Sequence, residues 1–238
     1  MKTLNNEIIN YKIINHSNNC YLNVIIQMLL KSKYTCDIIL NSNLLNIKND
    51  IIEPSNLLTL IKNNIDINRQ NDAQEALTFI LDKLPKLNTL FEGSTKKKFK
   101  CGNCNKIRIK EDTFITLNIY EQSMEKSIKN MLKDEEYNLE CEKCKCTSKT
   151  QVKNNISNIG KLLVFYNIQK IKLDISLYIQ YNNNKYKLIG YIKHFGNQNG
   201  GHYIYYDTLN NLEIDDMSIR TVSSHNLDNI YLIIYEKN

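Results

Sequence analysis

Cys20 lies where a polar, turn-forming run from Asn15 to Asn19 becomes an apolar pattern. Apolar residues with the spacing of one helix face follow it: Leu22, Ile25, Ile26, Leu29 and Leu30. With Asn18 or Asn19 as the N-cap, Cys20 falls in the first helical turn, where free backbone N–H groups and the helix dipole favour a thiolate. The spacing therefore predicts a nucleophile. The alternative is a small buried hydrophobe, because free cysteine is often buried.

A histidine and two carboxylates near the C-terminal end could complete such a site. Gly200 and Gly201 directly precede His202, and glycines permit close backbone approach at the entrance of a strand. Asp215 and Asp216 follow, and a carboxylate can fix the tautomer of an imidazole and stabilise the imidazolium. Each group alone is ordinary, since a histidine beside a strand is often structural and an acidic turn is often solvated. Together with a cysteine they indicate nucleophilic catalysis.

Two C-x2-C pairs form a second constellation, Cys101 with Cys104 and Cys141 with Cys144. Four thiolates from two tight turns are the ligands of a tetrahedral zinc ion, and such a site is structural because no coordination position stays open. A redox C-x-x-C motif is the alternative, but it expects one pair at the start of a helix. Cys146 is a spare thiol that could substitute as a ligand. We expect one structural zinc ion.

The elements that position these groups change in character along the chain. Besides the helix at Cys20, the pattern predicts helices over 56–65 and 72–84, and later one near 124–132. Short segments rich in Ile, Tyr, Val and Phe predict strands over 106–110, 113–120, 162–168, 175–181, 185–193, 202–207 and 230–235. Asparagines at 182–184 and 210–211 indicate hairpin turns. Helices followed by antiparallel strands predict an α+β fold.

The composition indicates a globular protein. The chain has 238 residues, 42% of them hydrophobic, which is enough for a core and excludes general disorder. The formal charge of +6 comes from scattered lysines, so nucleic acid is an unlikely partner. The N-terminus lacks an apolar signal core and no apolar run approaches the roughly 20 residues of a membrane span, so we expect a soluble intracellular protein without a membrane partner. The bias toward Asn, Ile and Lys favours an AT-rich genome, such as that of a large DNA virus or a protist.

Several segments, in order, resemble the ubiquitin-specific proteases, a family of papain-like cysteine peptidases that cleave after the C-terminal glycine of ubiquitin. Residues 15–27 resemble the cysteine box G-L-x-N-x-G-N-T-C-Y-x-N-S-x-x-Q, and residues 69–75 resemble Q-Q-D-A-x-E. Residues 90–93 resemble L-F-x-G before the first cysteine pair, and Gly201-His202-Tyr203 matches the histidine box. Departures are Ser17, Asn19, Val24 and Ala76, together with the lack of a tryptophan before Asp215. None of them removes a catalytic role.

The resemblance implies a role for each matching residue. Cys20 would be the nucleophile and His202 the general base and acid. Asp216 would be the carboxylate that orients the histidine, with Asp215 as the alternative. Asn15 would donate to the oxyanion, and such a donor typically contributes about 10²–10³ in turnover.

Further residues and the fold follow from the same resemblance. Asn18 would support the oxyanion site, and Asp72, Gly201 and Tyr203 would lie beside the C-terminal tail of the substrate. For Asp72 the alternative is an acid at a helix start. The implied fold is a single catalytic domain over 1–238, with a helical thumb over about 1–90, fingers with the zinc ribbon over about 95–160, and a palm of antiparallel sheet in the remainder.

The implied activity is hydrolysis of the peptide or isopeptide bond after the terminal glycine of ubiquitin, through a thioester on Cys20. Ubiquitin and ubiquitinated proteins would be the partners of a monomer in the cytoplasm or nucleus, in a host cell if the protein is viral. Three alternatives stay open. They are a protease for a ubiquitin-like modifier, an inactive ubiquitin-binding module and a zinc-ribbon protein that binds nucleic acid.

Overall fold

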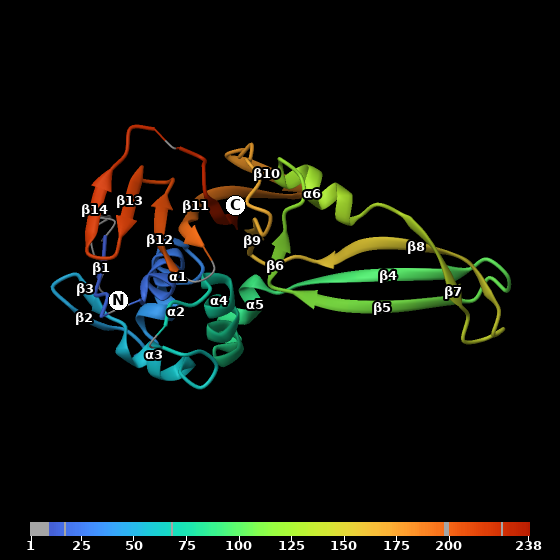
Figure 1. Ribbon diagram of the computed structural model, residues 1–238, viewed down its shortest axis with the longest axis horizontal. Coiled ribbons are helices and arrows are strands. Elements are labelled where there is room, and N and C mark those ends of the chain that lie inside the picture. Colours follow the sequence, from blue (N-terminus) through green and yellow to red (C-terminus); the bar gives the residue numbers. More distant parts are fainter. Residues whose placement is uncertain (1–9, 17, 68, 198–199, 225) are drawn as a thin grey trace.

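The computed structural model describes residues 10–16, 18–67, 69–197, 200–224 and 226–238. A helical lobe covers one face of a central sheet, and a second, narrow sheet projects from the body like a long arm (Figure 1). This arrangement confirms the predicted α+β class. Among the described residues, no helix combines the length and the apolar character that a membrane crossing requires.

The helical lobe is built around α1, which begins at Cys20. The helices are α1 (Cys20–Lys31), α2 (Cys36–Leu40), α3 (Ser55–Ile61), α4 (Ala73–Lys83), α5 (Pro85–Phe91) and α6 (Met124–Met131). All of α1 except Lys31 is buried, because the helix lies between the other helices and the sheet. The three further predicted helices are confirmed, although α3 ends before residue 65. Helices α2 and α5 were not predicted, and α5 begins with Pro85 in the first turn, where proline is well tolerated.

The central sheet contains the strands that carry the predicted histidine and carboxylates. Its members are β6 (Thr116–Asn118), β9 (Leu162–Tyr166), β10 (Tyr178–Tyr181), β11 (Asn184–Asn197), β12 (Gly200–Asp207), β13 (Leu212–Asp215), β14 (Ser218–Thr221) and β15 (Ile230–Lys237). Their order is β14-β13-β12-β11-β15-β9-β6, with β10 beside β11. Asn182 and Asn211 adopt left-handed backbone in the predicted hairpin turns, at φ of 51° and 55°. Among the described residues of this sheet, β6 and β9 form the only parallel pair.

Two apolar clusters fill the two faces of the central sheet. On the helical side, Ile192 and Tyr205 pack with α1 and α4. On the other side, Tyr191 stacks on Tyr206 with ring centroids 4.9 Å apart, and α6 completes this cluster. The sheet is therefore covered by apolar side chains on both faces.

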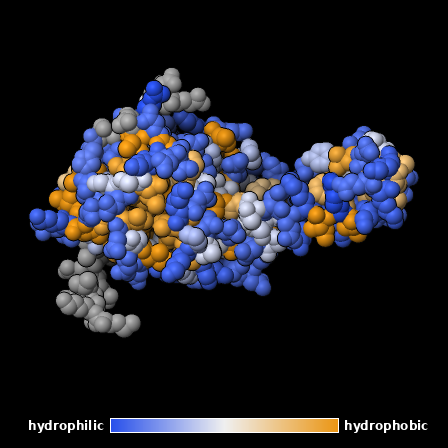
Figure 2. All heavy atoms as spheres, turned by 90° about the horizontal axis from the view of Figure 1, so that it is seen from below, coloured by the Kyte–Doolittle hydropathy of each residue, from blue (hydrophilic) through white to orange (hydrophobic). Residues whose placement is uncertain are grey.

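The projecting sheet is formed by β4 (Gly93–Cys101), β5 (Ile107–Phe114), β7 (Glu135–Glu140) and β8 (Thr147–Asn158). Their order is β5-β4-β8-β7, and all pairs are antiparallel. Few side chains in it are buried, since both faces meet solvent, and its surface is mainly hydrophilic (Figure 2). Its tip carries the two C-x2-C turns.

A small third sheet connects the chain before α1 to the central sheet. It contains β1 (Lys12–Ile13), β2 (Asn46–Lys48) and β3 (Ile51–Glu53) in the order β1-β3-β2. The N–H of Ile13 donates to the backbone carbonyl of Asp216 at 3.0 Å. The segment that enters α1 is thereby tied to the turn that follows β13.

Candidate active site and metal centre

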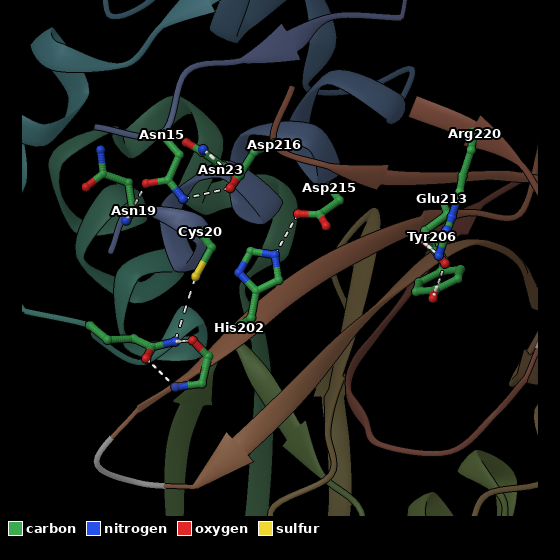
Figure 3. Close-up of polar contacts among 12 residues, drawn as sticks. Asn15, Asn19, Cys20, Asn23, His202, Tyr206, Glu213, Asp215, Asp216 and Arg220 are labelled. Atoms are coloured by element: carbon green, nitrogen blue, oxygen red, sulfur yellow. Dashed lines mark hydrogen bonds and ion pairs between the residues drawn. The ribbon is translucent and has the colours of Figure 1, made fainter. Parts of the chain in front are cut away.

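Cys20 is the first residue of α1 and its side chain points toward His202 (Figure 3). The N-cap is Asn19, whose side chain makes no capping hydrogen bond. The backbone N–H of Asn19 instead donates to Oδ1 of Asn15 at 3.1 Å. The position of the sulfur at a helix N-terminus therefore agrees with the prediction from the sequence, and a thiolate there faces the positive end of the helix dipole.

His202, on β12, lies between Cys20 and Asp215 (Figure 3). Its Nε2 is 2.6 Å from Oδ1 of Asp215, and the other ring nitrogen faces the sulfur. The pKa of His202 is raised to about 9, first by the hydrogen bond with Cys20 and further by the hydrogen bond and charge of Asp215, while burial opposes the rise. The arrangement favours a thiolate beside an imidazolium, with Asp215 holding the ring.

Asp216 does not contact the ring, so the prediction that it orients His202 is wrong. Asp215 pairs with Ser218 across the hairpin, which leaves Asp216 and Met217 as a two-residue turn. Asp216 adopts left-handed backbone with φ of 49° and turns its carboxylate toward α1. There it accepts hydrogen bonds from Asn15 Nδ2 at 2.6 Å and from Asn23 Nδ2 at 2.7 Å. Asp215, the alternative in the sequence analysis, takes the place beside His202.

The side-chain amide of Asn15 is fixed at both ends beside the start of α1. Its oxygen accepts from Asn19 and its nitrogen donates one hydrogen to Asp216, so a second N–H is left for another acceptor. Asn18 has left-handed backbone, with φ of 54°, in the turn before Cys20. The oxyanion roles of Asn15 and Asn18 stay predictions. Ser17 lies outside the described residues.

Gln70 was not predicted as a site residue, yet it reaches both sides of the active site from the loop before α4. Its Nε2 donates to the carbonyl of Gly201 and lies 3.7 Å from the sulfur of Cys20. Its Oε1 accepts from the N–H of Gly201. The only signal in the sequence is its place in the segment that resembles Q-Q-D-A-x-E.

Gly201 cannot be replaced by a larger residue without local movement. A Cβ built on it would clash with the backbone oxygen of Phe195 and with Nε2 of His194. Because Gly201 directly precedes His202, this close packing fixes the backbone from which the imidazole projects. The predicted contact of Gly201 with substrate stays a prediction.

A cavity of about 340 Å³ lies beside the active site and contains the other two residues predicted to contact substrate. Its lining is Gln70, Asn71, Asp72, Tyr166, Ile168, Lys170, His194, Gly200, Tyr203 and Tyr231. Tyr203 stacks on His194 with ring centroids 4.3 Å apart. Burial lowers the pKa of His194, the charge of Lys170 lowers it further, and Asp72 opposes the change. The cavity therefore has aromatic walls, one carboxylate and one lysine.

Asp72 serves two structural roles at the edge of this cavity. It is the N-cap of α4, accepting from the N–H groups of Gln74 at 2.7 Å and Glu75 at 3.2 Å. Its other carboxylate oxygen accepts from the hydroxyl of Tyr231. The alternative noted for the sequence, an acid at a helix start, is therefore correct, and the same carboxylate also lines the cavity.

The four predicted zinc ligands meet at the tip of the projecting sheet. Their sulfurs all lie within 4.8 Å of one another, with 3.9 Å between Cys101 and Cys144 and 3.7 Å between Cys104 and Cys141. A tetrahedral zinc ion with Zn–S bonds of about 2.3 Å places its sulfurs about 3.8 Å apart. The spacing of the thiols therefore fits zinc without rearrangement.

The two C-x2-C turns have the same backbone geometry. In each, the N–H four residues after the first cysteine donates to the carbonyl of that cysteine, from Asn105 to Cys101 at 3.0 Å and from Lys145 to Cys141 at 2.8 Å. Both donors have left-handed backbone. Cys146 is exposed, and its thiol donates to the carbonyl of Cys144 at 3.3 Å, outside the group of four.

Comparison with known proteins extends over nearly the whole chain. A family model described as "Ubiquitin carboxyl-terminal hydrolase" matches residues 11–235. No curated protein sequence matches the chain.

Several solved structures have a similar fold. One is a SAGA DUB module of Ubp8, Sgf11, Sus1 and Sgf73 bound to monoubiquitin, which gives a TM-score of 0.79 at 18% sequence identity. This match covers 96% of this chain and 69% of that one. The module bound to ubiquitin aldehyde gives a TM-score of 0.77 at 18% sequence identity. The match covers 96% of this chain and 70% of that one. A yeast SAGA DUB module with a mutant Sgf73 gives a TM-score of 0.74 at 20% sequence identity. The match covers 96% of this chain and 68% of that one. At these identities the likeness shows the fold, and it confirms the expected papain-like arrangement of thumb, palm and fingers.

Proposed function

The chain belongs to the ubiquitin carboxyl-terminal hydrolase family of thiol-dependent deubiquitinating peptidases, and we propose that Cys20, His202 and Asp215 are its catalytic triad. The observation that carries this assignment is the position of the His202 ring, between the Cys20 sulfur and the Asp215 carboxylate. A thiol, an imidazole and an orienting carboxylate in this order form the machinery of acyl transfer. The neighbouring cavity supplies room for the tail of the substrate.

In the first half of the reaction, the Cys20 thiolate attacks the carbonyl carbon of the terminal glycine of ubiquitin. A carbon–sulfur bond forms and the carbonyl oxygen becomes an oxyanion, bound by Asn15 Nδ2 and by backbone N–H groups at the start of α1. The carbon–nitrogen bond then breaks as His202 gives its proton to the departing amine. The products are a free amine and a thioester on Cys20.

In the second half, water hydrolyses the thioester. His202, now neutral, takes a proton from the water while the hydroxyl oxygen bonds to the carbonyl carbon. The carbon–sulfur bond breaks, which releases the terminal carboxylic acid of ubiquitin and regenerates the thiolate beside the imidazolium. The acid then loses its proton to solvent. Asp215 holds the same ring orientation in both halves, through its hydrogen bond to Nε2.

The cavity would accept an extended tail of the substrate. Tyr203 and Tyr231 form its walls, Asp72 supplies a carboxylate and Lys170 a cation, so a peptide with apolar and polar groups can be bound there. Gly200 lines this cavity, and its lack of a side chain leaves room beside Gln70 for a substrate residue that also lacks one. The C-terminal tail of ubiquitin, with its final diglycine, would fit such a narrow space.

The four fingertip cysteines would hold a single zinc ion, which supplies a rigid crosslink between two hairpin turns and no catalytic chemistry. Cys101 is the last residue of β4 and Cys141 directly follows β7, while Cys104 and Cys144 lie in the turns that lead to β5 and β8. Closing them around one point fixes the length and direction of the projecting sheet, whose few buried side chains give little other support. The sheet would then present a stable surface to the substrate.

Reaction with modifiers that carry a C-terminal electrophile tests the assignment. Propargylamides of ubiquitin and of several ubiquitin-like proteins would be incubated with the protein and with Cys20→Ala. We expect a covalent adduct with ubiquitin that is absent in the variant, since solved structures of the same fold are bound to ubiquitin. Preferential labelling by a ubiquitin-like modifier would favour the alternative substrate. Adducts with no modifier would reject the protease, and ubiquitin binding without an adduct would indicate an inactive binding module.

A further inference from the structure

Gln70 is one of the residues through which the two halves of the active site contact each other. Cys20 belongs to the helical lobe and His202 to the central sheet, and Gln70 precedes α4 in the loop that faces both. Its amide contacts the sulfur of Cys20 and both backbone groups of Gly201, the residue directly before His202. The mechanism above assigns it no role.

These contacts use the nitrogen and the oxygen of the Gln70 amide. A primary amide has two N–H donors and a carbonyl oxygen that can accept two hydrogen bonds. One N–H points to the carbonyl of Gly201 and Nε2 lies 3.7 Å from the Cys20 sulfur, while the oxygen accepts from the N–H of Gly201. Neither Glu nor Leu can satisfy all three partners, because the first lacks donors and the second lacks both functions.

The contact with Gly201 replaces a missing strand neighbour. On one side, β12 pairs with β11 along its whole length, including Gly201 opposite Gly196. On the other side, β13 pairs with β12 only from Tyr205 to Asp207. The backbone groups of Gly201 would therefore lie at an open sheet edge, and the Gln70 amide pairs with them as a peptide group of a neighbouring strand would.

We propose that Gln70 is a positioning residue that holds the backbone before His202 against the helical lobe, so that the imidazole stays aligned with the Cys20 sulfur. The proposal rests on the proposed function, because it assigns a role in the reaction of the same triad. Two glycines precede His202 and give its backbone unusual freedom. A side-chain amide that fixes both polar groups of Gly201 removes this freedom at the point where it would misplace the base.

Gln70→Leu tests the proposal, with Gln74→Leu as the matched control. Gln74 lies on the next turn of the same segment, and its amide contacts Thr78 and Thr116 at 3.3 Å, away from the sulfur. With a fluorogenic ubiquitin substrate, we expect Gln70→Leu to lower kcat by about 10²-fold, the effect of a misplaced catalytic group, with KM unchanged. Gln74→Leu should keep the wild-type kcat, and both variants should keep the wild-type melting temperature.

A second variant separates positioning from a merely structural role. Gln70→Glu keeps an acceptor for the N–H of Gly201 but places a carboxylate near the thiolate, which disfavours the negative sulfur. We expect the pH profile of Cys20 alkylation by iodoacetamide to move to higher pH in this variant and to stay in place in Gln74→Leu. An unmoved profile would contradict the contact with the sulfur.

The outcomes distinguish this proposal from failure of the proposed function. If the wild-type protein forms no adduct with ubiquitin electrophiles, the protease assignment fails before Gln70 is examined. If the wild type reacts and Gln70→Leu turns over at the same kcat, the positioning role is wrong. A lower KM with unchanged kcat in Gln70→Leu would also overturn it, because Gln70 would then obstruct the entry of the tail.

Discussion

Asp216 accepts a hydrogen bond of 2.6 Å from the side-chain amide of Asn15, a residue 201 positions earlier in the chain. Its second carboxylate oxygen binds Asn23 on α1, and its backbone carbonyl accepts from Ile13. The turn after β13 is thereby bound to the segment before α1 at two points and to α1 itself at a third. The two adjacent aspartates therefore contact different groups. Asp215 binds the ring of His202, and Asp216 binds Asn15, the expected oxyanion donor.

We predict that Asp216→Ala lowers turnover by releasing Asn15. Without the carboxylate, the Asn15 amide can rotate away from the sulfur, and loss of an oxyanion donor costs about 10²–10³ in kcat. The measurement is kcat with a ubiquitin substrate, together with the affinity for ubiquitin aldehyde, whose adduct carries an oxygen at the oxyanion position. Asp82→Ala, at an exposed position on α4, is the control. Wild-type affinity for the aldehyde in Asp216→Ala would contradict the role of Asn15.

Much of the site could be predicted because its signals are local. The apolar spacing after Cys20 fixes the helix start, the asparagine pairs fix two hairpins, and the C-x2-C spacing identifies the four clustered thiols. The central strands have apolar patterns because both sheet faces are covered. The helix start, the hairpins and the cysteine pairs depend on a few neighbouring residues. The central strands are buried, and their apolar sequences indicate that burial.

The features that were not predicted are of two kinds. Some depend on contacts between segments that are distant in the sequence, and others are strands whose two faces are exposed to solvent. Strands β4 and β8 have polar side chains on both faces, so no apolar alternation marks them as strands. The roles of Asp215 and Asp216 depend on the left-handed backbone of one turn residue, which composition does not determine. Gln70 is polar and lies in a loop, and only the folded chain brings it to Gly201, 131 positions away.

The activity should have an alkaline limit set by His202. Its pKa of about 9 keeps the imidazolium, and with it the ion pair with the thiolate, at neutral pH. As pH rises through about 9, His202 loses its proton and can no longer protonate the departing amine, so kcat/KM should fall. Asp215→Asn removes a charge that raises this pKa, and the alkaline limb should therefore move to lower pH. An alkaline limb at the same pH in the variant would show that Asp215 does not stabilise the imidazolium.

Removing a zinc ligand should separate the projecting sheet from the catalytic chemistry. In Cys141→Ser we expect loss of bound zinc, measured by atomic emission on the purified protein, and turnover of ubiquitin should fall because the sheet loses its crosslink. Alkylation of Cys20 by iodoacetamide should be unchanged, since the triad lies on other elements. Cys146→Ser is the control, because this thiol lies outside the four-sulfur group. Zinc retained by Cys141→Ser but lost by Cys146→Ser would reassign the ligands.

The two functions of Asp72 can be separated by two substitutions. Asparagine caps helices as well as aspartate does, so Asp72→Asn should keep α4 intact, whereas Asp72→Ala should lower the free energy of unfolding by about 0.5–2 kcal/mol. Both variants lose the carboxylate in the cavity, and KM for ubiquitin should rise in both by about tenfold, equivalent to about 1.4 kcal/mol of binding. Urea denaturation and steady-state kinetics measure the two effects. If Asp72→Asn keeps the wild-type KM, the carboxylate serves α4 and Tyr231 alone and does not contact the tail of the substrate.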